Sequence, residues 1–503
     1  MFRWGPGQAM HEIELKFQVP GGQRAAVDAA VAGRSGSARA RLQAAYLDTA
    51  DRSLAAAGMA LRLRREGRRW VQTLKGRTAD TMTRLEHNVP RGAGAAMPGV
   101  DPSLHAGTPA GDALNSVLAT QAADALSVRY STDILRRTRV LRLPGGRVEL
   151  AFDVGHIRAA GRTIDVLELE IESLSGPPQA VLIAARRWVP RHGLWLDTRS
   201  KAERGDLLAS GTTMAAPVRA ASVVLMAGMS GPAAWQCALN SCADQILGNA
   251  SQIAAGEHLP EHVHQLRVGL RRLRSAMKLF EGEGADPALA VPAAALFRRL
   301  GVARDTAVIE TEFAAELMAA LQAEGMAPDA ELLPRSPAAE SPTDVLREPA
   351  SQLFLLDLLA AQQLPRVEEI GSAAPLRERL ARRLSRWHRQ VLRDAACFDT
   401  LDDATLHRLR KRAKRLRYAA EFAGSLFERR PLRRYLRAMD AVQDRLGTIT
   451  DSLMVARAFR NASDAAVHRA FALGWLAARR AALIRDAAPA LKAFRKAERF
   501  WKG

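Results

Sequence analysis

Two hydrophobic periods divide this chain into two halves. Up to about residue 206, charged and apolar residues repeatedly alternate with a period of two, as in the segments HEIELKF, ALRLRRE, RVELAFD and VLELEIE. Several short runs of this kind predict an antiparallel β-barrel or sandwich. After about residue 228, Ala, Leu and Arg recur at spacings of three and four, which predicts helices. We therefore expect a two-domain chain, with an antiparallel barrel domain of the α+β class followed by an all-α domain.

The segment between the two patterns predicts the domain boundaries. Residues 207–228 are the best candidate for a linker. We expect the barrel domain to span residues 10–206 and the helical domain to span residues 229–500. Loops rich in Pro and Gly are expected at about 90–110 and 325–349.

The helical half contains an internal repeat. The segments that begin at His264 and at His407 both have Arg at +3, Arg or Lys at +7, and Arg at +8 and +10. A Leu-Gly-x-x-x-Asp motif, at residues 300–305 and 446–451, follows each copy, and we interpret it as a turn. Two copies of one helical unit predict a helical-bundle domain with a pseudo-twofold repeat.

The net charge indicates a polyanionic partner. The chain has 73 Lys and Arg against 53 Asp and Glu, so its formal charge is +20. Nucleic acid, an acidic membrane or polyphosphate would each suit this excess. Three cysteines without metal-ligand spacing favour a reducing compartment. No secretory signal and no run of about 18 apolar residues is found, which predicts a soluble cytoplasmic protein that does not bind membranes.

The first strand of the barrel half carries chemistry on one face. Glu12, Glu14 and Lys16 lie at alternate positions and share a face. A single such strand is most often amphipathic with a solvated face, but the pattern recurs along this half. The recurring same-face sets are Arg62 and Arg64, Arg84 and Glu86, Glu149 and Asp153, and Glu168, Glu170 and Glu172.

Such a set of residues predicts a metal and phosphate tunnel. Carboxylates on neighbouring strands repel one another unless a cation or basic residues neutralise them. Mg²⁺ and Mn²⁺ prefer hard carboxylate oxygens, whereas Arg and Lys suit an oligophosphate. A barrel with a polar interior and an apolar exterior covered by other elements would gather both sets around one axis.

The barrel half resembles a known family. Residues 12–16, Glu-Ile-Glu-Leu-Lys, are similar to the ExExK signature of CYTH domains, the triphosphate tunnel metalloenzymes. The ordered agreement continues over about residues 10–206, which is far more specific than ExExK alone. The further matching segments are Tyr46 to Thr49, Gly58 to Arg64, Thr73 to Gly76, Arg84 to Glu86, Glu168 to Glu172 and Ser200 to Gly205.

The resemblance implies an eight-stranded antiparallel tunnel that binds triphosphate along its axis. It assigns the divalent metal, Mg²⁺ or Mn²⁺, to Glu12, Glu14, Asp153, Glu168 and Glu170. It assigns the substrate phosphates to Lys16, Arg62, Arg64, Lys75, Arg136 and Lys201. Glu172 could replace or extend the Glu168 and Glu170 pair, and Arg137 or Arg139 competes with Arg136.

The residue types and the resemblance together predict metal-dependent hydrolysis of inorganic triphosphate to diphosphate and phosphate. Glu12, Glu14 and Lys16 are the residues that we assign to catalysis. Attack by water, activated by a second metal or a nearby carboxylate, requires no covalent intermediate. No P-loop motif is present. The family also includes adenylate cyclases and thiamine triphosphatases, and these activities stay open.

The two repeated helices each carry a stripe of basic residues opposite an apolar stripe. A charged stripe on one helix usually faces water, and then it normally mixes both signs. Residues 264–280 hold basic side chains and no acidic one, and the same is true of residues 407–418. The repetition, with His at the same place, therefore favours a polyanion site.

These helices resemble the CHAD domain over about residues 228–500. The resemblance implies paired four-helix bundles with a basic groove that binds inorganic polyphosphate. A helix-packing hydrogen bond is the alternative role for each repeated histidine, and we interpret His258 and His262 as surface residues. The residues assigned to polyphosphate are His264, Arg267, Arg271, Arg274, His407, Arg410, Lys414 and Arg417.

Two other classes of protein remain as alternatives to a triphosphatase with a polyphosphate-docking domain. The first is a polyphosphate-binding protein without turnover, associated with polyphosphate granules. The second is a nucleic-acid-binding protein, which the scarcity of aromatic residues on the basic helices disfavours. The preferred metal, the oligomeric state and the pathway cannot be predicted from this sequence.

Overall fold

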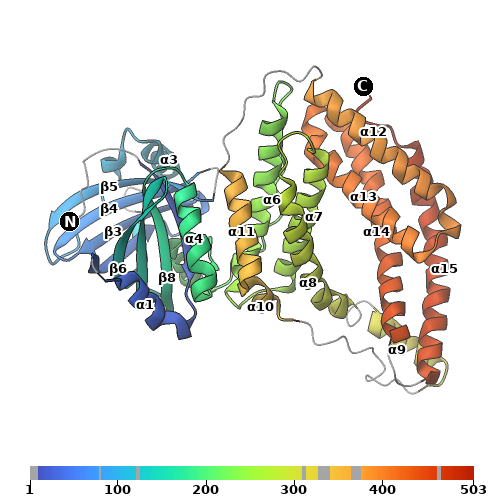
Figure 1. The fold of residues 1–503 in the computed structure, drawn as a ribbon, viewed down its shortest axis with the longest axis horizontal. Coiled ribbons are helices and arrows are strands. Elements are labelled where there is room, and N and C mark those ends of the chain that lie inside the picture. Colours follow the sequence, from blue (N-terminus) through green and yellow to red (C-terminus); the bar gives the residue numbers. More distant parts are fainter. Residues whose placement is uncertain are drawn as a thin grey trace. The chain divides into compact units, whose positions relative to one another are not determined.

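The computed structural model describes residues 10–34, 36–78, 81–119, 125–308, 313–326, 340–363, 375–461 and 466–502. The N-terminal part is built from β-strands (Figure 1). These are β1 (Met10–Gln18), β2 (Ser37–Asp48), β3 (Met59–Glu66), β4 (Arg69–Arg77), β5 (Thr83–Ala93), β6 (Ser127–Leu143), β7 (Gly146–Ala159), β8 (Arg162–Ser175) and β9 (Trp195–Leu196).

Eight of these strands close into an antiparallel barrel. The sheet order is β5-β4-β3-β2-β6-β7-β8-β1-β9, and an additional pairing of β5 with β1 joins its two ends. The short strand β9 pairs with β1 beside the closed ring. The register brings acidic and basic residues opposite one another, for example Lys16 against Glu170 and Arg136 against Asp153. The predicted eight-stranded tunnel is confirmed.

Both faces of the strands are buried, but by different surroundings. On β1, Leu15 and Phe17 are 3% and 0% exposed and pair in register with Ile171 and Leu169 of β8. Helix α4 (Gln179–His192) packs over this apolar outer face, against β1, β7 and β8 (Figure 1). Glu14 and Lys16, on the opposite face, are also buried. The alternation along the strands therefore separates an apolar outer wall from a polar interior.

Further helices cover the rest of the outer wall. Helix α1 packs on β6 and β7, while α2 and α3 pack on the strands β2 to β5. The bounds of these elements are η1 (Gly21–Gln23), α1 (Arg24–Ala32), α2 (Ser53–Ala56), η2 (Pro102–His105) and α3 (Pro109–Leu118).

Helix α5 (Lys201–Ala209) is positioned by a specific cap and a close contact. Ser200 and Glu203 form a capping box, in which each side chain accepts a hydrogen bond from the other residue's backbone N–H. A Cβ atom at Gly205 would lie 2.2 Å from the ring of Tyr130, so only glycine permits this approach. The cap and the contact together fix the direction in which the first residues of α5 point.

A buried histidine of the barrel domain should make its stability depend on pH. His105 is fully buried and lies 2.9 Å from His87 and 3.1 Å from Gln72. Burial and the neighbouring His87 lower the pKa of His105 to about 4. Below its ordinary pKa of about 6.5, the unfolded chain therefore takes up a proton that the folded chain refuses.

We expect the free energy of unfolding to fall as the pH drops from about 6.5 to about 4. The loss due to His105 is about 3 kcal/mol and is absent above the ordinary pKa. Urea unfolding of the native chain and of His105→Gln at several pH values measures it. The variant should show a smaller pH dependence across this window, and equal slopes for the two chains would contradict the prediction.

The C-terminal part is helical, as predicted (Figure 1). Its longer helices are α6 (Gly231–Ala254), α7 (Pro260–Leu279), α8 (Ala290–Val308), α9 (Ala314–Ala323), α10 (Pro342–Arg347), α11 (Pro349–Gln362), α12 (Leu376–Asp394), α13 (Asp403–Ala423), α14 (Arg429–Asn461) and α15 (Ala466–Lys496). Short 3-10 segments are η3 (Pro287–Leu289), η6 (Ala395–Thr400) and η7 (Gly424–Leu426).

The repeated sequence motif forms α7 in its first copy and α13 in its second. The apolar stripes are buried in both copies, with Leu266 and Leu270 on α7 and Leu409 and Leu416 on α13. The Leu-Gly-x-x-x-Asp motifs are not turns, so that prediction is wrong. They lie inside α8 and α14, where a single glycine costs only about 1 kcal/mol relative to alanine and helix packing outweighs it.

The chain separates into two compact units that do not follow the division into strands and helices. The first unit holds the barrel together with residues 246–265 and 346–364, and the second holds the remaining helices. Within the first unit, α11 packs on α4, and the side chain of Gln352 accepts a hydrogen bond from the backbone N–H of Leu196 at 2.8 Å. The predicted loop at 325–349 falls partly outside the described residues.

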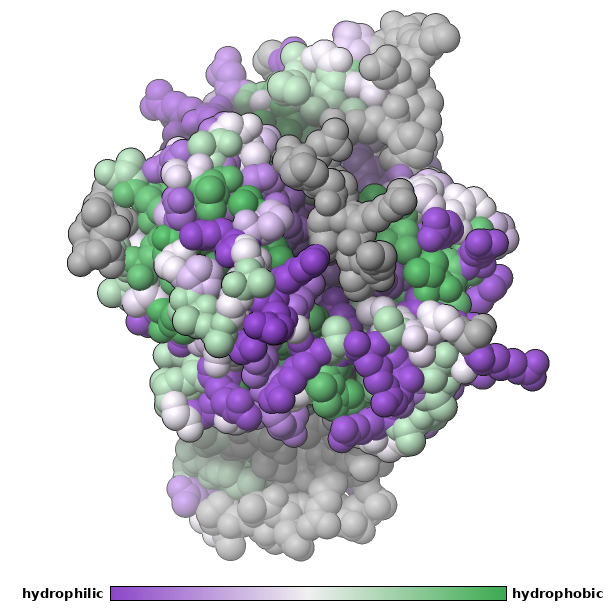
Figure 2. All heavy atoms as spheres, turned by 90° about the vertical axis from the view of Figure 1, so that its left-hand side faces the viewer, coloured by the Kyte–Doolittle hydropathy of each residue, from purple (hydrophilic) through white to green (hydrophobic). Residues whose placement is uncertain are grey.

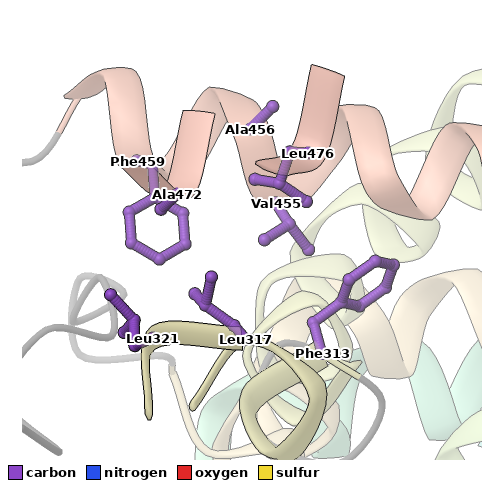
Figure 3. Packing of buried hydrophobic residues seen from close by; sticks show 8 residues of the cluster. All are labelled: Phe313, Leu317, Leu321, Val455, Ala456, Phe459, Ala472 and Leu476. Carbon is purple, nitrogen blue, oxygen red and sulfur yellow. The ribbon is translucent and has the colours of Figure 1, made fainter. Parts of the chain in front are cut away.

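Within the second unit, consecutive helices α12 to α15 pack against one another. Helix α9 adds an apolar contact to α14 and α15 (Figure 3). The buried side chains of this cluster are Phe313, Leu317, Leu321, Val455, Ala456, Phe459, Ala472 and Leu476. Across the described residues, no helix combines the length and the apolar content that a membrane crossing requires.

Candidate functional site

Three carboxylates of the barrel interior form a compact acidic cluster. One oxygen from each of Asp153, Glu168 and Glu170 can be chosen so that all three lie within 4.8 Å of one another. The Lys201 ammonium group, at the start of α5, is 2.8 Å from both Asp153 and Glu170 and also contacts Glu168. From β6, Arg136 donates two hydrogen bonds to Asp153, at 2.7 and 2.6 Å, and also contacts Glu170.

These charges stabilise one another inside the barrel. Burial alone would raise the pKa of Glu170, but Lys201, Arg136 and Lys16 hold it well below its usual range. Burial also opposes protonation of Lys201, and the three carboxylates outweigh this and raise its pKa. The cluster therefore keeps a cationic centre surrounded by three acidic side chains.

The donor set fits a divalent metal. Carboxylate oxygens that converge on one point are the ligands that Mg²⁺ and Mn²⁺ prefer, and the side chains already surround a positive charge. The ammonium group of Lys201 marks the point at which the three carboxylates converge. Three arginines of β6 were candidates for the phosphate site. Arg136 faces inward, while Arg137 pairs with Asp28 of α1 and Arg139 donates to the Ala30 carbonyl.

A second acidic group lies around Lys75 of β4. Its ammonium group is 2.6 Å from Glu12 and 2.7 Å from Glu86. Burial raises the pKa of Glu12 well above its usual value despite Lys75. Burial would do the same for Glu86, but Lys75, a hydrogen bond with Glu12 and Arg62 hold its pKa well below. The carboxylates predicted as metal ligands therefore fall into two groups, with Glu12 beside Lys75.

Glu14 lies between further cations. Its side chain contacts Lys16 and is 3.6 Å from Arg84 of β5. Burial alone would raise the pKa of Glu14, but Lys16 and Lys75 outweigh it and lower the pKa. Nearby Glu172 has a pKa raised to about 7, mainly by burial, which Lys75 offsets only in part.

Two arginines of β3 carry unsatisfied donors. The Nε atoms of Arg62 and Arg64 are buried and have no hydrogen-bond partner in the described part of the chain. Arg62 donates to the Tyr46 hydroxyl at 3.3 Å, and Arg64 contacts Glu66. Burial, Arg62 and Arg136 lower the pKa of Arg64, so these cations are crowded. Buried guanidinium groups with donors to spare suit a multivalent anion.

Some interior residues were not assigned from the sequence. Arg204 contacts Glu168 from the same face of α5 as Lys201, and Arg84 approaches both Glu14 and Glu203. The spacing of three between Lys201 and Arg204 on a helix could have indicated the first of these. In the space-filling view of Figure 2, hydrophilic residues gather in the lower middle of the visible face.

The basic stripe of α7 is partly engaged in helix packing. Arg267 is 8% exposed, donates to the Leu300 carbonyl at 2.7 Å and lies 4.8 Å from the centre of the Phe297 ring. Arg271 lies over the same ring at 5.6 Å. Arg274 is exposed, but partial burial of its guanidinium group and the like charge of Arg298 lower its pKa. Arg274 and Arg298, which the sequence analysis did not assign, therefore form a pair of like charges.

The basic stripe of α13 meets acidic residues of α14. Arg410 is 3.2 Å from Asp451, and Arg417 is 2.5 Å from Asp440. Arg417 also pairs with Glu421 at 2.7 Å. His407 is exposed, and burial together with Lys411 and Arg410 lowers its pKa. The stripe thus meets acidic residues both of the neighbouring helix and, at Glu421, of its own helix, and Lys414 also has partners.

The histidines near the start of α7 differ in their surroundings. His262 is 1% exposed, lies 2.9 Å from the Ala215 carbonyl and accepts a hydrogen bond from Leu259 at 3.0 Å. The interpretation of His262 as a surface residue is therefore wrong, because residues far along the chain cover it. His258 and His264 are both half-buried.

The fold and the tunnel residues define a tunnel-type barrel protein joined to a basic helical domain. Residues 10–205 match the family model of the CYTH domain, and residues 237–461 match that of the CHAD domain. The chain therefore consists of a CYTH domain followed by a CHAD domain, as the sequence motifs predict.

Several solved structures are similar to parts of this chain. The CHAD domain from the plant Ricinus communis is 29% identical, with a TM-score of 0.46, and the match covers 57% of this chain and 98% of that one. A Bacillus halodurans protein assigned as an adenylate cyclase is 20% identical, with a TM-score of 0.29 and coverage of 38% and 96%. A Hippeastrum protein, described as an adenylyl cyclase with a dominant triphosphatase activity, is 18% identical, with a TM-score of 0.28 and coverage of 40% and 96%.

Proposed function

We propose that this protein is a divalent-metal-dependent inorganic triphosphatase whose helical domain binds polyphosphate. The supporting observation is the closed barrel interior that brings acidic and basic side chains of separate strands together. Three carboxylates converge on Lys201, while the Nε atoms of Arg62 and Arg64 have no hydrogen-bond partner among the described residues. No one strand could supply this combination.

The proposed metal ligands are Asp153, Glu168 and Glu170, with Glu14 near enough to feel the charge of Glu170. A divalent ion bound there would neutralise phosphate oxygens and polarise the phosphoryl group. Glu12 belongs to the proposed ligand set only if it gives up the proton that its buried environment favours. Binding of a cation would favour that release.

The basic residues would bind and orient the substrate. Arg62 and Arg64 present guanidinium donors that can form paired hydrogen bonds with phosphate oxygens. Lys16, Lys75, Arg136 and Lys201 would exchange carboxylate contacts for phosphate contacts as the metal takes over the carboxylates. Cations held inside the barrel would stabilise the charge that develops on the leaving diphosphate. A half-buried carboxylate such as Glu172 could orient the attacking water.

Substrate choice tests the proposal directly. We expect the full chain to release phosphate from inorganic triphosphate with Mg²⁺ or Mn²⁺ faster than from ATP, thiamine triphosphate or long-chain polyphosphate. A colorimetric phosphate assay at matched substrate concentrations measures the four rates. A higher rate on ATP or thiamine triphosphate would identify that compound as the substrate instead of inorganic triphosphate. A cyclic nucleotide product would indicate cyclase chemistry.

The proposed polyphosphate site includes the exposed Arg274 on α7. Because Arg274 and Arg298 repel each other, a polyanion that bridges them should gain binding energy. We expect Arg274→Ala to weaken polyphosphate binding and to lower the slope of log affinity against log salt by about 1. Titration of long-chain polyphosphate at several salt concentrations measures both quantities.

Lys278 supplies the matched control on the same helix. Its side chain is 61% exposed and lies 3.7 Å from Glu281, so its charge is already compensated in part. Lys278→Ala should change the affinity and the slope less than Arg274→Ala does. Equal effects of the two substitutions would indicate a diffuse charge effect and no defined site. Stronger displacement of polyphosphate by RNA at matched charge would favour a nucleic-acid partner.

A further inference from the structure

A cavity of about 600 Å³ lies in the second compact unit, and no residue of the basic stripes of α7 and α13 lines it. It is formed by the later part of α12, the end of α15 and the segment that follows α15. Its lining includes five cationic side chains and a single carboxylate, that of Glu498. The cationic residues are Arg389, Arg495, Lys496, Arg499 and Lys502.

These cations have no acidic ion-pair partner among the residues that the structure describes. Within the described part of the chain, none of the five forms an ion pair, whereas other arginines of the same unit do. Arg495 donates a hydrogen bond to the Ala395 carbonyl at 2.7 Å. Five cations that converge on one cavity with a single carboxylate, that of Glu498, repel one another, and a multivalent anion would relieve this repulsion.

Capping of a helix terminus explains only part of the set. Arg495 and Lys496 lie in the last turn of α15, where cations stabilise the helix dipole and free carbonyl groups. Arg389 comes from the interior of α12, and Arg499 and Lys502 lie beyond α15. Because these three come from two different segments, dipole capping of one helix does not account for their convergence.

The cavity has a rigid aromatic base. His388, which lines it, is 3% exposed and lies 2.9 Å from the hydroxyl group of Tyr435. The Trp501 ring contacts both His388 and Tyr435, and its N–H group donates to Ser385 at 2.8 Å. The segment after α15 is therefore anchored by buried rings, and Arg499 and Lys502 flank the anchor.

The lining chemistry favours a small phosphate anion. Three arginines can bind phosphate oxygens in paired hydrogen bonds, and the volume is that of a small-molecule site. The nearby aromatic rings are buried in mutual contacts, Tyr435 at 0% and Trp501 at 5% exposure, so they offer no face for a nucleobase. We propose that this cavity binds a small inorganic phosphate anion, such as diphosphate, separately from the tunnel and from the stripes of α7 and α13.

Trp501 provides a local reporter for this site. The chain has eight tryptophans, and replacing them with 5-fluorotryptophan gives ¹⁹F resonances of which Trp501→Phe identifies the relevant one. The full chain is titrated with inorganic diphosphate without metal at constant ionic strength. We expect a saturable shift of the Trp501 resonance. Because diphosphate in the tunnel does not contact this ring, failure of the proposed triphosphatase activity would leave the result unchanged.

Substitutions test which cations hold the anion. Arg499→Ala/Lys502→Ala should raise the Kd of the Trp501 response by at least about tenfold, because it removes two charge-assisted contacts. The matched control Arg430→Ala/Arg433→Ala removes two exposed cations of the same unit that do not line the cavity, and should leave the Kd within about twofold.

Several outcomes would overturn the proposal. A Trp501 resonance that does not respond to diphosphate is one, and an equal loss of affinity in both double variants is another. If sodium sulfate gives the same response at the same concentrations, the response reflects unspecific anion screening, and the proposal is overturned. If Arg499→Ala/Lys502→Ala fails to fold, Arg389→Ala/Lys496→Ala, which removes two exposed side chains, provides the same comparison.

Discussion

Replacement of Glu170 with Gln is expected to lower kcat/KM for triphosphate hydrolysis by about 10²–10³-fold. Glu170 contributes an oxygen to the acidic cluster and contacts both Lys201 and Arg136. Gln keeps the size of the side chain but loses the charge that a divalent metal requires. The affinity for Mn²⁺, measured by calorimetry in the absence of substrate, should fall together with the rate.

Asp165 provides a control on the same strand. Its side chain is 88% exposed, so Asp165→Asn removes a carboxylate of β8 outside the barrel interior. We expect this variant to keep the native rate and Mn²⁺ affinity. If Glu170→Gln retained both, the assignment of the acidic cluster to the metal would have to be abandoned.

Replacement of Lys75 with Met should destabilise the barrel by about 3–5 kcal/mol at neutral pH. The substitution removes the ammonium group that lies 2.6 Å from Glu12 and 2.7 Å from Glu86. Glu86 would then keep the more distant Arg62, at 4.0 Å, and Glu12 would lose its ion-pair partner. Urea unfolding, followed by a signal from the barrel domain, measures the loss.

A second substitution separates the charge effect from a packing effect. Lys75→Met/Glu12→Gln removes one of the stranded carboxylates and should recover part of the lost stability. Lys75→Arg, which keeps the charge, should cost less than Lys75→Met. No recovery in the double variant would show that Lys75 acts through its hydrocarbon chain, contrary to the account given for this group.

The alternation of residues along the strands predicted an antiparallel barrel or sandwich with charged residues grouped on one face, and the CYTH resemblance selected the closed tunnel. Leu15 and Phe17 lie against the outer wall, and Glu14 and Lys16 point inward, because side chains on a strand alternate between its two faces. The regular ladder between β1 and β8 carries this alternation from strand to strand. Sequence alone could therefore group these residues on one face.

Pairing inside the barrel could not be read from that pattern. Lys201 lies on α5, and its contact with three carboxylates depends on the cap at Ser200 and on the close approach that Gly205 allows. Glu12 lies beside Lys75 because β5 pairs with both β4 and β1. Which carboxylate each cation pairs with depends on differences of a few ångströms in position, and the alternation along a strand does not encode these differences.

In the helical domain, the sequence pattern shows the charges along each helix but not those of the helices that pack against it. Residues 407–418 contain no acidic residue, yet Asp451 and Asp440 of α14 approach Arg410 and Arg417. The contribution of α11 to the barrel unit likewise depends on packing between segments far apart in the chain. Non-local contacts of this kind carry no local periodic signal.

The central claim is that the barrel interior hydrolyses triphosphate with a divalent metal. ³¹P NMR of inorganic triphosphate incubated with the full chain and Mg²⁺ tests it most directly. We predict that diphosphate and orthophosphate appear in equal amounts, that EDTA stops their formation, and that Glu170→Gln nearly abolishes it. Triphosphate that binds the barrel with Mg²⁺ present but is never converted would contradict the claim and indicate a phosphate-binding protein.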